Sequence, residues 1–325
     1  MDKKERLKYG IIGVGGIGGY YGGRLANAGF DVSFLLHTDY NYVKINGLRV
    51  ESCRGDFIVK PIAAIGSPQE MPVCDVMLVC LKTTNNYLLP KLLQHAVGTN
   101  TITVLLQNGL GNEAALSAMM PDLRLAGGLA FICAWKAGAG YIVHADYGML
   151  NIGGYNLTET DMETLAQVQR DFIQSGIKCT LTNDLYAARW QKLLWNIPYN
   201  GLTVALNTTT ARLMQEKPSR ELVRRIMHEV VNAANACGVP MNAAQVDKMM
   251  EMTDTMRPYS PSMKLDCDAH RPLEIEAIYT RPVQEARRHG CEMPCVEMLE
   301  EQLQFIQATN AIVVPVTPNA EKTAP

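Results

Sequence analysis

The chain has 325 residues, in which 30 Lys and Arg balance 32 Asp and Glu. This balance argues against a nucleic-acid partner, and no uncharged apolar run approaches the roughly 20 residues that a membrane span needs. The nine cysteines are scattered and contain no CxxC pair, which predicts reduced, mostly buried thiols in a cytoplasmic protein and no metal site.

Residues 9–180 alternate short apolar runs with helical patterns. Strands are predicted at 9–14, 32–36, 50–52, 57–60, 76–81, 101–106, 125–133 and 141–152. Helices are predicted at 18–28, 86–96 and 112–119. This alternation is typical of a mainly parallel, doubly wound sheet, and the β-branched run 76–81 is expected near its centre.

A glycine-rich loop joins the first predicted strand to the first predicted helix. Gly13-Val14-Gly15-Gly16-Ile17-Gly18 fits the pattern G-x-G-x-x-G. In that pattern the first glycine permits a tight turn, the second lets a pyrophosphate approach the backbone, and the third lets helix and strand pack closely. Free amides and the helix dipole then bind the anion. A glycine-rich turn without a ligand is the alternative, but the flanking strand and helix favour dinucleotide binding.

The residues after the second predicted strand bear on which dinucleotide is bound. An acidic residue there binds the ribose 2′-hydroxyl of NAD, and a basic residue accommodates the 2′-phosphate of NADP. His37 is a weak phosphate ligand, and Asp39 lies at about the right distance along the chain for the ribose. That both are solvated loop residues is an equally good interpretation.

Two further strand ends carry polar residues. Lys82 follows the strand 76–81, and Gln107-Asn108-Gly109-Leu110-Gly111 follows the strand 101–106. Ligands of such sheets bind at the carboxyl ends of the strands. The alternatives are a solvated lysine and an ordinary Asn-Gly turn.

Strand signals nearly vanish after residue 183. Helices are predicted at 185–206, 219–237, 243–256, 273–289 and 294–309. We therefore expect an α/β fold in two domains: a Rossmann-type dinucleotide-binding domain at 1–182 and an all-helical domain at 183–325. Residues 1–7 and 316–325 are too polar or irregular to pack.

Three polar residues recur on one face of the helix at 185–206. Lys192, Asn196 and Asn200 are spaced i, i+4, i+8 among Leu, Trp, Ile and Tyr residues. One lysine and two amides in an apolar helix suit a buried site for a small anionic or hydroxylated ligand. A desolvated lysine can also have a lowered pKa, as a proton donor near neutrality requires. On spacing alone, a surface lysine with two structural asparagines explains the pattern better, and Pro198 complicates the helix.

Other polar and sulfur-containing residues have structural interpretations. Ser262 is suited to cap a helix. Glu274 and Glu276 flank Ile275, so at most one of them faces a site. The methionines at 249, 250, 252 and 256 have helical spacing, and they belong either to the core or to a homodimer interface.

Taken in order, these motifs resemble the ketopantoate reductase (2-dehydropantoate 2-reductase) family over about residues 9–310. The resemblance rests on the glycine loop, Leu81-Lys82, Gln107-Asn108-Gly109-Leu110-Gly111, Lys192-x3-Asn196-x3-Asn200 and Ser262-x11-Glu274. It implies a Rossmann domain, a helical domain, an active site in the cleft between them, and reduction of 2-dehydropantoate by NADPH.

The resemblance also implies roles for individual residues. Lys192 matches the catalytic lysine, which donates a proton as hydride reaches the keto carbon, and Glu274 matches a glutamate at cofactor and substrate. Ser262 matches the serine that binds the polar end of the substrate. The implied cofactor contacts are Gly13, Val14, Gly15, Gly16, Ile17, Gly18, His37, Lys82, Asn108, Ala134 (through its backbone) and Glu274. The implied substrate contacts are Asn108, Lys192, Asn196, Asn200 and Ser262.

Two positions depart from the family pattern. His37 stands where the family often has an arginine, so NAD(H) remains open beside NADP(H); Lys44 or Arg49 are candidates to compensate. Thr210 stands where some members have another substrate-side asparagine.

The function that we expect is NADPH-dependent reduction of 2-dehydropantoate to pantoate, on the route to pantothenate and coenzyme A. Two alternatives remain: a reductase of another 2-keto acid with the same fold, and a dinucleotide-binding sensor without turnover. The expected partner is a small 2-keto acid, with no nucleic acid or membrane.

Overall fold

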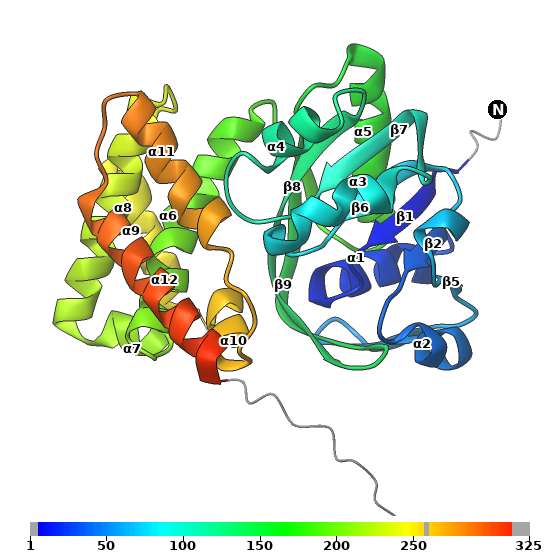
Figure 1. Ribbon diagram of the computed structural model, residues 1–325, viewed down its shortest axis with the longest axis horizontal. Coiled ribbons are helices and arrows are strands. Elements are labelled where there is room, and N and C mark those ends of the chain that lie inside the picture. The colour runs from blue at the N-terminus through cyan, green and yellow to red at the C-terminus, as the bar shows by residue number, and fades with distance from the viewer. Residues whose placement is uncertain (1–5, 257–259, 314–325) are drawn as a thin grey trace, which may run out of the picture. The chain divides into compact units, whose positions relative to one another are not determined.

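The computed structural model describes residues 6–256 and 260–313. The chain divides into two compact units, Met1–Arg189 and Trp190–Pro325 (Figure 1). The division falls within one helix, α6 (Leu185–Ala205). The expectation that residues 316–325 do not pack lies outside the described residues, as do residues 1–5. Residues 6 and 7 do pack: Arg6 Nη1 donates to the Gly29 carbonyl at 2.8 Å, and Leu7 contacts the core.

The described part of the first unit contains a ten-stranded sheet. Along it the strands run β4-β3-β9-β8-β7-β6-β1-β2-β5, and β10 pairs with β9. Only β3–β4 and β8–β9 pair antiparallel among the described strands. The bounds are β1 (Lys8–Ile12), β2 (Asp31–Leu35), β3 (Leu48–Ser52), β4 (Phe57–Val59), β5 (Ala63–Ile65), β6 (Cys74–Val79), β7 (Val97–Leu105), β8 (Arg124–Gly138), β9 (Tyr141–Gly154) and β10 (Cys179–Leu181).

Helices cover both faces of this sheet, because its strands are apolar on both sides. Ile11 of β1 belongs to the core beneath α1 (Gly16–Asn27) and α5 (Glu159–Gln174). The next residue, Ile12, points to the other face, into the core beneath α3 (Leu89–Leu93) and α4 (Asn112–Met119). The shorter helices are α2 (Tyr40–Asn46), η1 (Pro68–Glu70) and η2 (Thr83–Leu88). The predicted doubly wound sheet is confirmed.

The sheet curls around α1. Strands β4 and β5 end the strand order on opposite sides, yet only residues 60–62 join them, so these two edges lie within about 15 Å. Accordingly α1 contacts β1, β2, β3, β4, β8 and β9. Residues 18–23 of α1 are all buried, and four of these six are glycine. An added Cβ at Gly22 would lie 2.8 Å from Ile11, and one at Gly23 3.3 Å from Phe57.

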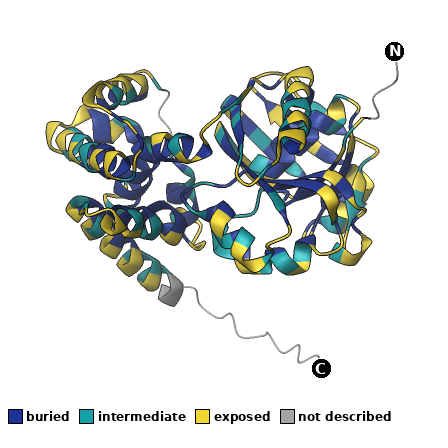
Figure 2. Ribbon diagram, turned by 90° about the horizontal axis from the view of Figure 1, so that it is seen from above, coloured by how far each residue is buried: buried dark blue, intermediate teal, exposed yellow. Residues whose placement is uncertain are grey.

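The described part of the second unit is helical, as predicted. It contains the rest of α6 with α7 (Thr210–Gln215), α8 (Lys217–Ala236), α9 (Ala243–Asp254), α10 (Ser262–Asp268), the π-helical turn η3 (Glu276–Thr280), α11 (Arg281–Arg288) and α12 (Pro294–Val313). Burial follows the helix faces: inner faces are buried and outer ones exposed (Figure 2). Helix α6 is buried on most sides and runs through Pro198 without a break.

Several local predictions were wrong. Residues 86–96 were expected to form one helix, but a 3₁₀ segment, η2, precedes the short α3 there, with Pro90 at the start of α3. Helices α2, α5 and α7 were not predicted. Burial of the cysteines is also less general than expected: Cys74, Cys133 and Cys179 are buried, Cys53 is exposed, and the other five are intermediate.

Candidate functional site

The glycine loop is shaped by backbone crowding at its first and last glycines. Strand β1 ends at Ile12, and Gly13 has a φ of +91° that favours glycine. A Cβ on Gly13 would lie 2.6 Å from the Leu81 amide nitrogen, and one on Gly18 would overlap the Gly13 carbonyl oxygen. A Cβ on Gly15, in contrast, meets no atom within 4 Å. Neighbouring backbone therefore crowds the loop at Gly13 and Gly18, whereas Gly15 faces open space. A pyrophosphate that approaches the loop backbone requires this arrangement.

The first turn of α1 presents backbone amides to this open side. The helix begins at Gly16, and its first internal bond runs from the Gly19 amide to the Gly15 carbonyl at 2.8 Å. The amides of Gly16, Ile17 and Gly18 precede that bond, so they have no hydrogen-bond acceptor within the helix. The first turn contains no acidic residue, and Gly15 supplies no side-chain cap. These groups fit the phosphates of a dinucleotide, which would add the missing acceptors.

Strand β8 borders the same turn. A Cβ on Gly16 would lie 2.6 Å from the Ala134 carbonyl oxygen and 2.8 Å from Trp135 Cα. The backbone of Ala134, predicted to contact the cofactor, thus lies directly against the glycine loop.

The ends of β6 and β7 are tied together by Gln107. This buried side chain donates to the Leu81 carbonyl at 2.9 Å and to Asn86 Oδ1 at 2.6 Å. Leu81 precedes Lys82, and Gln107 precedes Asn108, so the two predicted ligands follow tethered residues. Asn108 is partly exposed, and its carbonyl accepts from Asn112 Nδ2 at 2.8 Å. Lys82 is also partly exposed and immediately precedes η2.

Arg189 supports the same loop and was not singled out from the sequence. Its guanidinium donates to the Gln107 carbonyl and to Glu113 Oε1, and it lies 3.4 Å from the Leu105 carbonyl. Arg189 is 3 % exposed and Glu113 4 %. Glu113 belongs to α4 and Arg189 to α6, so a buried ion pair joins two helices beside Asn108.

The end of β2 holds an ion pair that the sequence did not reveal. His37 is exposed, but Asp39 is buried, so the interpretation of Asp39 as a solvated loop residue is wrong. Its Oδ2 accepts from Lys136 Nζ at 2.8 Å and from the Gly140 amide at 3.1 Å. Lys136 and Gly140 lie where β8 turns into β9.

In the second unit, Lys192, Asn196 and Asn200 are all buried, at 8 %, 5 % and 2 % exposure. A surface face is therefore excluded for them. Asn196 Nδ2 has no hydrogen-bond partner among the described residues. A buried amide donor without an acceptor costs about 1–3 kcal/mol, and a ligand oxygen would relieve that cost.

The π-helical turn contacts α6 on the same stretch. Tyr279 donates to the Ile197 carbonyl at 3.0 Å, and a Cβ on Gly201 would lie 2.7 Å from the Tyr279 hydroxyl oxygen. Glu274, which precedes this turn, is buried, and its carbonyl accepts from the Ile278 amide at 3.2 Å. Glu276 is exposed, so of the two glutamates only Glu274 is enclosed. π turns inserted in helices often accompany functional sites.

Ser262 does not cap a helix. It is the first residue of α10, and the capping position belongs to Pro261, which has no side-chain oxygen to offer. Ser262 is partly exposed. The expectation of a structural capping role is therefore wrong, which leaves the hydroxyl for another role.

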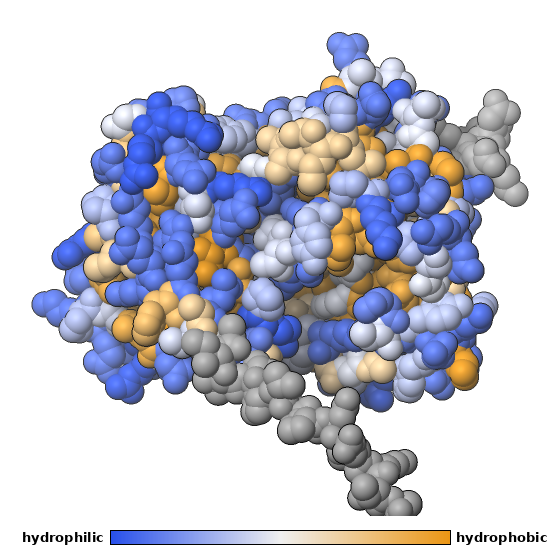
Figure 3. All heavy atoms as spheres, viewed as in Figure 1, coloured by the Kyte–Doolittle hydropathy of each residue, from blue (hydrophilic) through white to orange (hydrophobic). Residues whose placement is uncertain are grey.

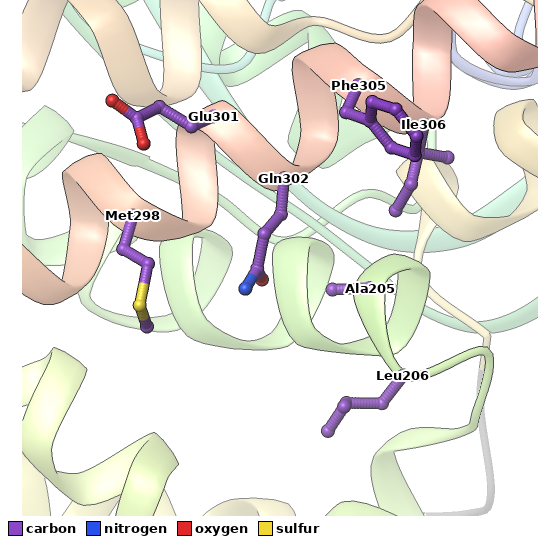
Figure 4. Close-up of a pocket in the computed structure, with 7 residues that line it drawn as sticks. All are labelled: Ala205, Leu206, Met298, Glu301, Gln302, Phe305 and Ile306. Atoms are coloured by element: carbon purple, nitrogen blue, oxygen red, sulfur yellow. The ribbon is translucent and has the colours of Figure 1, made fainter.

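One apolar pocket of the second unit contains none of these residues. It has a volume of about 440 Å³ and lies between the end of α6 and the middle of α12. Met298 and Gln302 extend from α12 toward α6 (Figure 4). Apolar residues reach the surface in several patches among hydrophilic ones (Figure 3).

Across the described chain, no three His, Cys, Asp or Glu side chains are arranged to hold a metal ion. Nor is any helix there long and apolar enough to cross a membrane.

Comparisons with known proteins match nearly the whole chain. The profile described as "Ketopantoate reductase PanE/ApbA" matches residues 9–156, and that of the C-terminal part of the same family matches residues 184–307. A 2-dehydropantoate 2-reductase from Nostoc sp. is 44 % identical over 306 residues, covering 93 % of this chain and 96 % of that protein.

Solved structures agree with this match. A 2-dehydropantoate 2-reductase from Geobacter metallireducens is 39 % identical, with a TM-score of 0.88. The match covers 92 % of this chain and 99 % of that one. A D-mandelate dehydrogenase solved with NADH and anilino(oxo)acetate shares the fold, with a TM-score of 0.86 at 20 % identity over 94 % of this chain and 100 % of that one. The chain belongs to the ketopantoate reductase family.

Proposed function

We propose that this protein reduces 2-dehydropantoate to pantoate with NADPH, in the synthesis of pantothenate and coenzyme A. The relative from Nostoc sp., 44 % identical over almost its whole length, carries the name of that activity. The observation that supports the proposal most directly is the buried Lys192, Asn196 and Asn200 face of α6, with an unpartnered amide donor at Asn196. A keto acid offers the carbonyl and carboxylate oxygens that such donors bind.

The residues of the first unit fit the cofactor. The amides of Gly16, Ile17 and Gly18 would hold its phosphates, and the open side of Gly15 leaves room for them. Ala134 would contribute its backbone, while His37, Lys82 and Asn108 stand at the carboxyl ends of β2, β6 and β7. When bound, the nicotinamide supplies hydride to the keto carbon.

Lys192 would supply the proton. Addition of hydride to the carbonyl carbon leaves negative charge on oxygen, and a nearby ammonium stabilises that charge and then protonates it. Asn196 and Asn200 would orient the substrate through their amides, and Ser262 would bind its polar end. Glu274 would hold cofactor and substrate.

A steady-state assay tests the proposal. The purified protein should oxidise NADPH in the presence of 2-dehydropantoate, and the product should be pantoate. Absence of oxidation at every pH from 5 to 9 would contradict the substrate assignment. Cofactor binding without turnover on any keto acid would instead support a sensor.

A different 2-keto acid is the second candidate, because a dehydrogenase named for mandelate has the same fold. A panel of aliphatic and aromatic keto acids with both cofactors separates it from the first. The higher kcat/KM identifies the substrate.

A further inference from the structure

The carboxylate of Asp39, in the segment after β2, already accepts hydrogen bonds from other groups of the protein. Asp39 is 7 % exposed, and its Oδ2 accepts two hydrogen bonds, from Lys136 Nζ at 2.8 Å and from the Gly140 amide at 3.1 Å. The Lys136 side chain is 31 % exposed. The negative member of the pair is thus enclosed, whereas the positive member still reaches solvent.

Asp39 lies near the position at which Rossmann-type domains distinguish NAD from NADP. It follows the glycine loop by about 20 residues, the position from which an acidic residue binds the ribose 2′-hydroxyl of NAD. In this chain the Lys136 ammonium offsets the charge of Asp39, which weakens its repulsion of a 2′-phosphate, and one of the two carboxylate oxygens is already engaged.

Lys136 also lies on the strand that borders the glycine loop. It follows Ala134 by two residues on β8, and a Cβ on Gly16 would come within 2.6 Å of the Ala134 carbonyl. One short stretch of β8 therefore extends from the phosphate-binding turn of α1 to the end of β2. A dinucleotide with its phosphates at that turn and its ribose at the end of β2 would therefore have this ammonium beside its ribose.

The two cations suggested by the sequence are placed less well. Lys44 is exposed on α2, where its Nζ donates to the Tyr40 hydroxyl at 3.0 Å. The Arg49 guanidinium lies 4.9 Å from the centre of the Tyr141 ring and 3.8 Å from Glu51 Oε2. Both are engaged on the surface with partners other than Asp39.

We propose that Lys136, held in place by Asp39, is the residue through which this chain recognises the 2′-phosphate of NADPH, in place of a basic residue at position 37. The inference rests on the proposed use of NADPH. It assigns the choice between NADPH and NADH to Lys136, which lies on β8 and outside the glycine loop.

Equilibrium binding without substrate tests the assignment, with the nicotinamide fluorescence of NADPH and of NADH as the signal. The wild-type protein should favour NADPH. Lys136→Met should raise the Kd for NADPH by about tenfold or more and change the Kd for NADH less than twofold. Lys136→Arg should stay close to wild type. Lys44→Met, the matched control, should alter neither Kd.

Other results would overturn the assignment. Equal weakening of both cofactors in Lys136→Met would mean that the lysine only supports the turn between β8 and β9. An unchanged NADPH Kd would mean that the phosphate is recognised elsewhere. If Lys136→Met does not fold, Lys136→Gln replaces it: glutamine can still donate to Asp39 but carries no charge, so it should raise the Kd for NADPH in the same way and leave that for NADH nearly unchanged. A wild-type protein that binds neither cofactor would instead contradict the proposed function.

Discussion

Arg189 and Glu113 form an ion pair whose side chains are 3 % and 5 % exposed, between the start of α6 and the first turn of α4. The same guanidinium donates to the Gln107 carbonyl, next to Asn108. One side chain thus satisfies a buried carboxylate and a loop carbonyl together, because the planar fork of arginine presents a separate N–H group to each.

Replacing Arg189 with Met should destabilise the protein strongly. The change leaves the Glu113 carboxylate buried without its cation, and removal of one partner from such a pair costs about 3–5 kcal/mol. Urea unfolding followed by circular dichroism measures the loss. Arg212→Met is the control, because Arg212 pairs with Glu216 on the surface at 67 % side-chain exposure and should cost less than about 1 kcal/mol. Equal losses in the two variants would refute the argument.

Two glycines of the loop should respond differently to alanine. A Cβ at Gly15 meets no atom within 4 Å, so Gly15→Ala should fold with nearly unchanged stability but bind NADPH at least tenfold more weakly. At Gly18 the Cβ would overlap the Gly13 carbonyl oxygen, so Gly18→Ala should lower the free energy of unfolding by several kcal/mol. Thermal unfolding and cofactor titration of both variants distinguish the roles. Wild-type cofactor affinity in Gly15→Ala would argue against the phosphate site.

Lys192→Met tests the proposed proton donor. A general acid contributes about 10²–10⁴-fold, so kcat should fall by that factor while the Kd for NADPH changes little. Lys217→Met, at an exposed position at the start of α8, should keep wild-type kcat. Near-normal turnover in Lys192→Met would remove the lysine from the reaction.

Asn196 should matter for substrate and not for folding. Its Nδ2 lacks an acceptor among the described residues, so Asn196→Ala should raise the KM for the keto acid about tenfold and cost little stability. Asn235 is the control, because its side-chain amide makes two hydrogen bonds with the Met241 backbone, each at 2.9 Å. Asn235→Ala should lower stability by about 1–3 kcal/mol with unchanged KM. If both asparagines behaved like Asn235, the Asn196 amide would be structural.

His144 should make stability depend on pH. Burial lowers the pKa of this imidazole, whose Nδ1 lies 2.8 Å from Ser52 Oγ and whose ring lies tilted against Tyr20, with the ring centres 4.1 Å apart. Below pH about 6.5 the unfolded chain takes up a proton that the folded protein does not, so the free energy of unfolding falls as the pH drops through this value.

Urea unfolding between pH 5 and 8 measures this dependence. His144→Gln should flatten the slope, which one histidine limits to about 1.4 kcal/mol per pH unit. The exposed His95→Gln should leave it as in wild type. Identical slopes in all three proteins would contradict the prediction.

Elements with strong local signals were predicted well from the sequence. Helix α4 has the predicted bounds, and β6 lies near the middle of the strand order because 76–81 is apolar throughout. Helix α5 had a readable signal that was missed: Thr158 and Asp161 form a capping box, and Leu165, Val168 and Phe172 give one apolar face. The 3₁₀ segment before α3 has no such pattern, so its helix type was not predictable.

The candidate site likewise has a part that local sequence predicts and a part that only the fold reveals. Lys192, Asn196 and Asn200 share a helix, so their spacing alone placed them on one face. The pairs Asp39–Lys136 and Arg189–Glu113 join segments far apart in the chain, and only the folded sheet brings them together. Charged residues of this kind look like surface residues in a sequence, because nothing local indicates that they are buried.

The curl of the sheet around α1 has a dynamic consequence. The helix that carries the glycine loop contacts strands from both ends of the strand order, so it cannot loosen unless the sheet itself opens. Local opening is usually confined to segments with few buried contacts. Amides in the middle of α1 should therefore exchange with solvent deuterium only through unfolding of the whole first unit. The phosphate-binding turn would then be as long-lived as the core, already shaped before any nucleotide arrives.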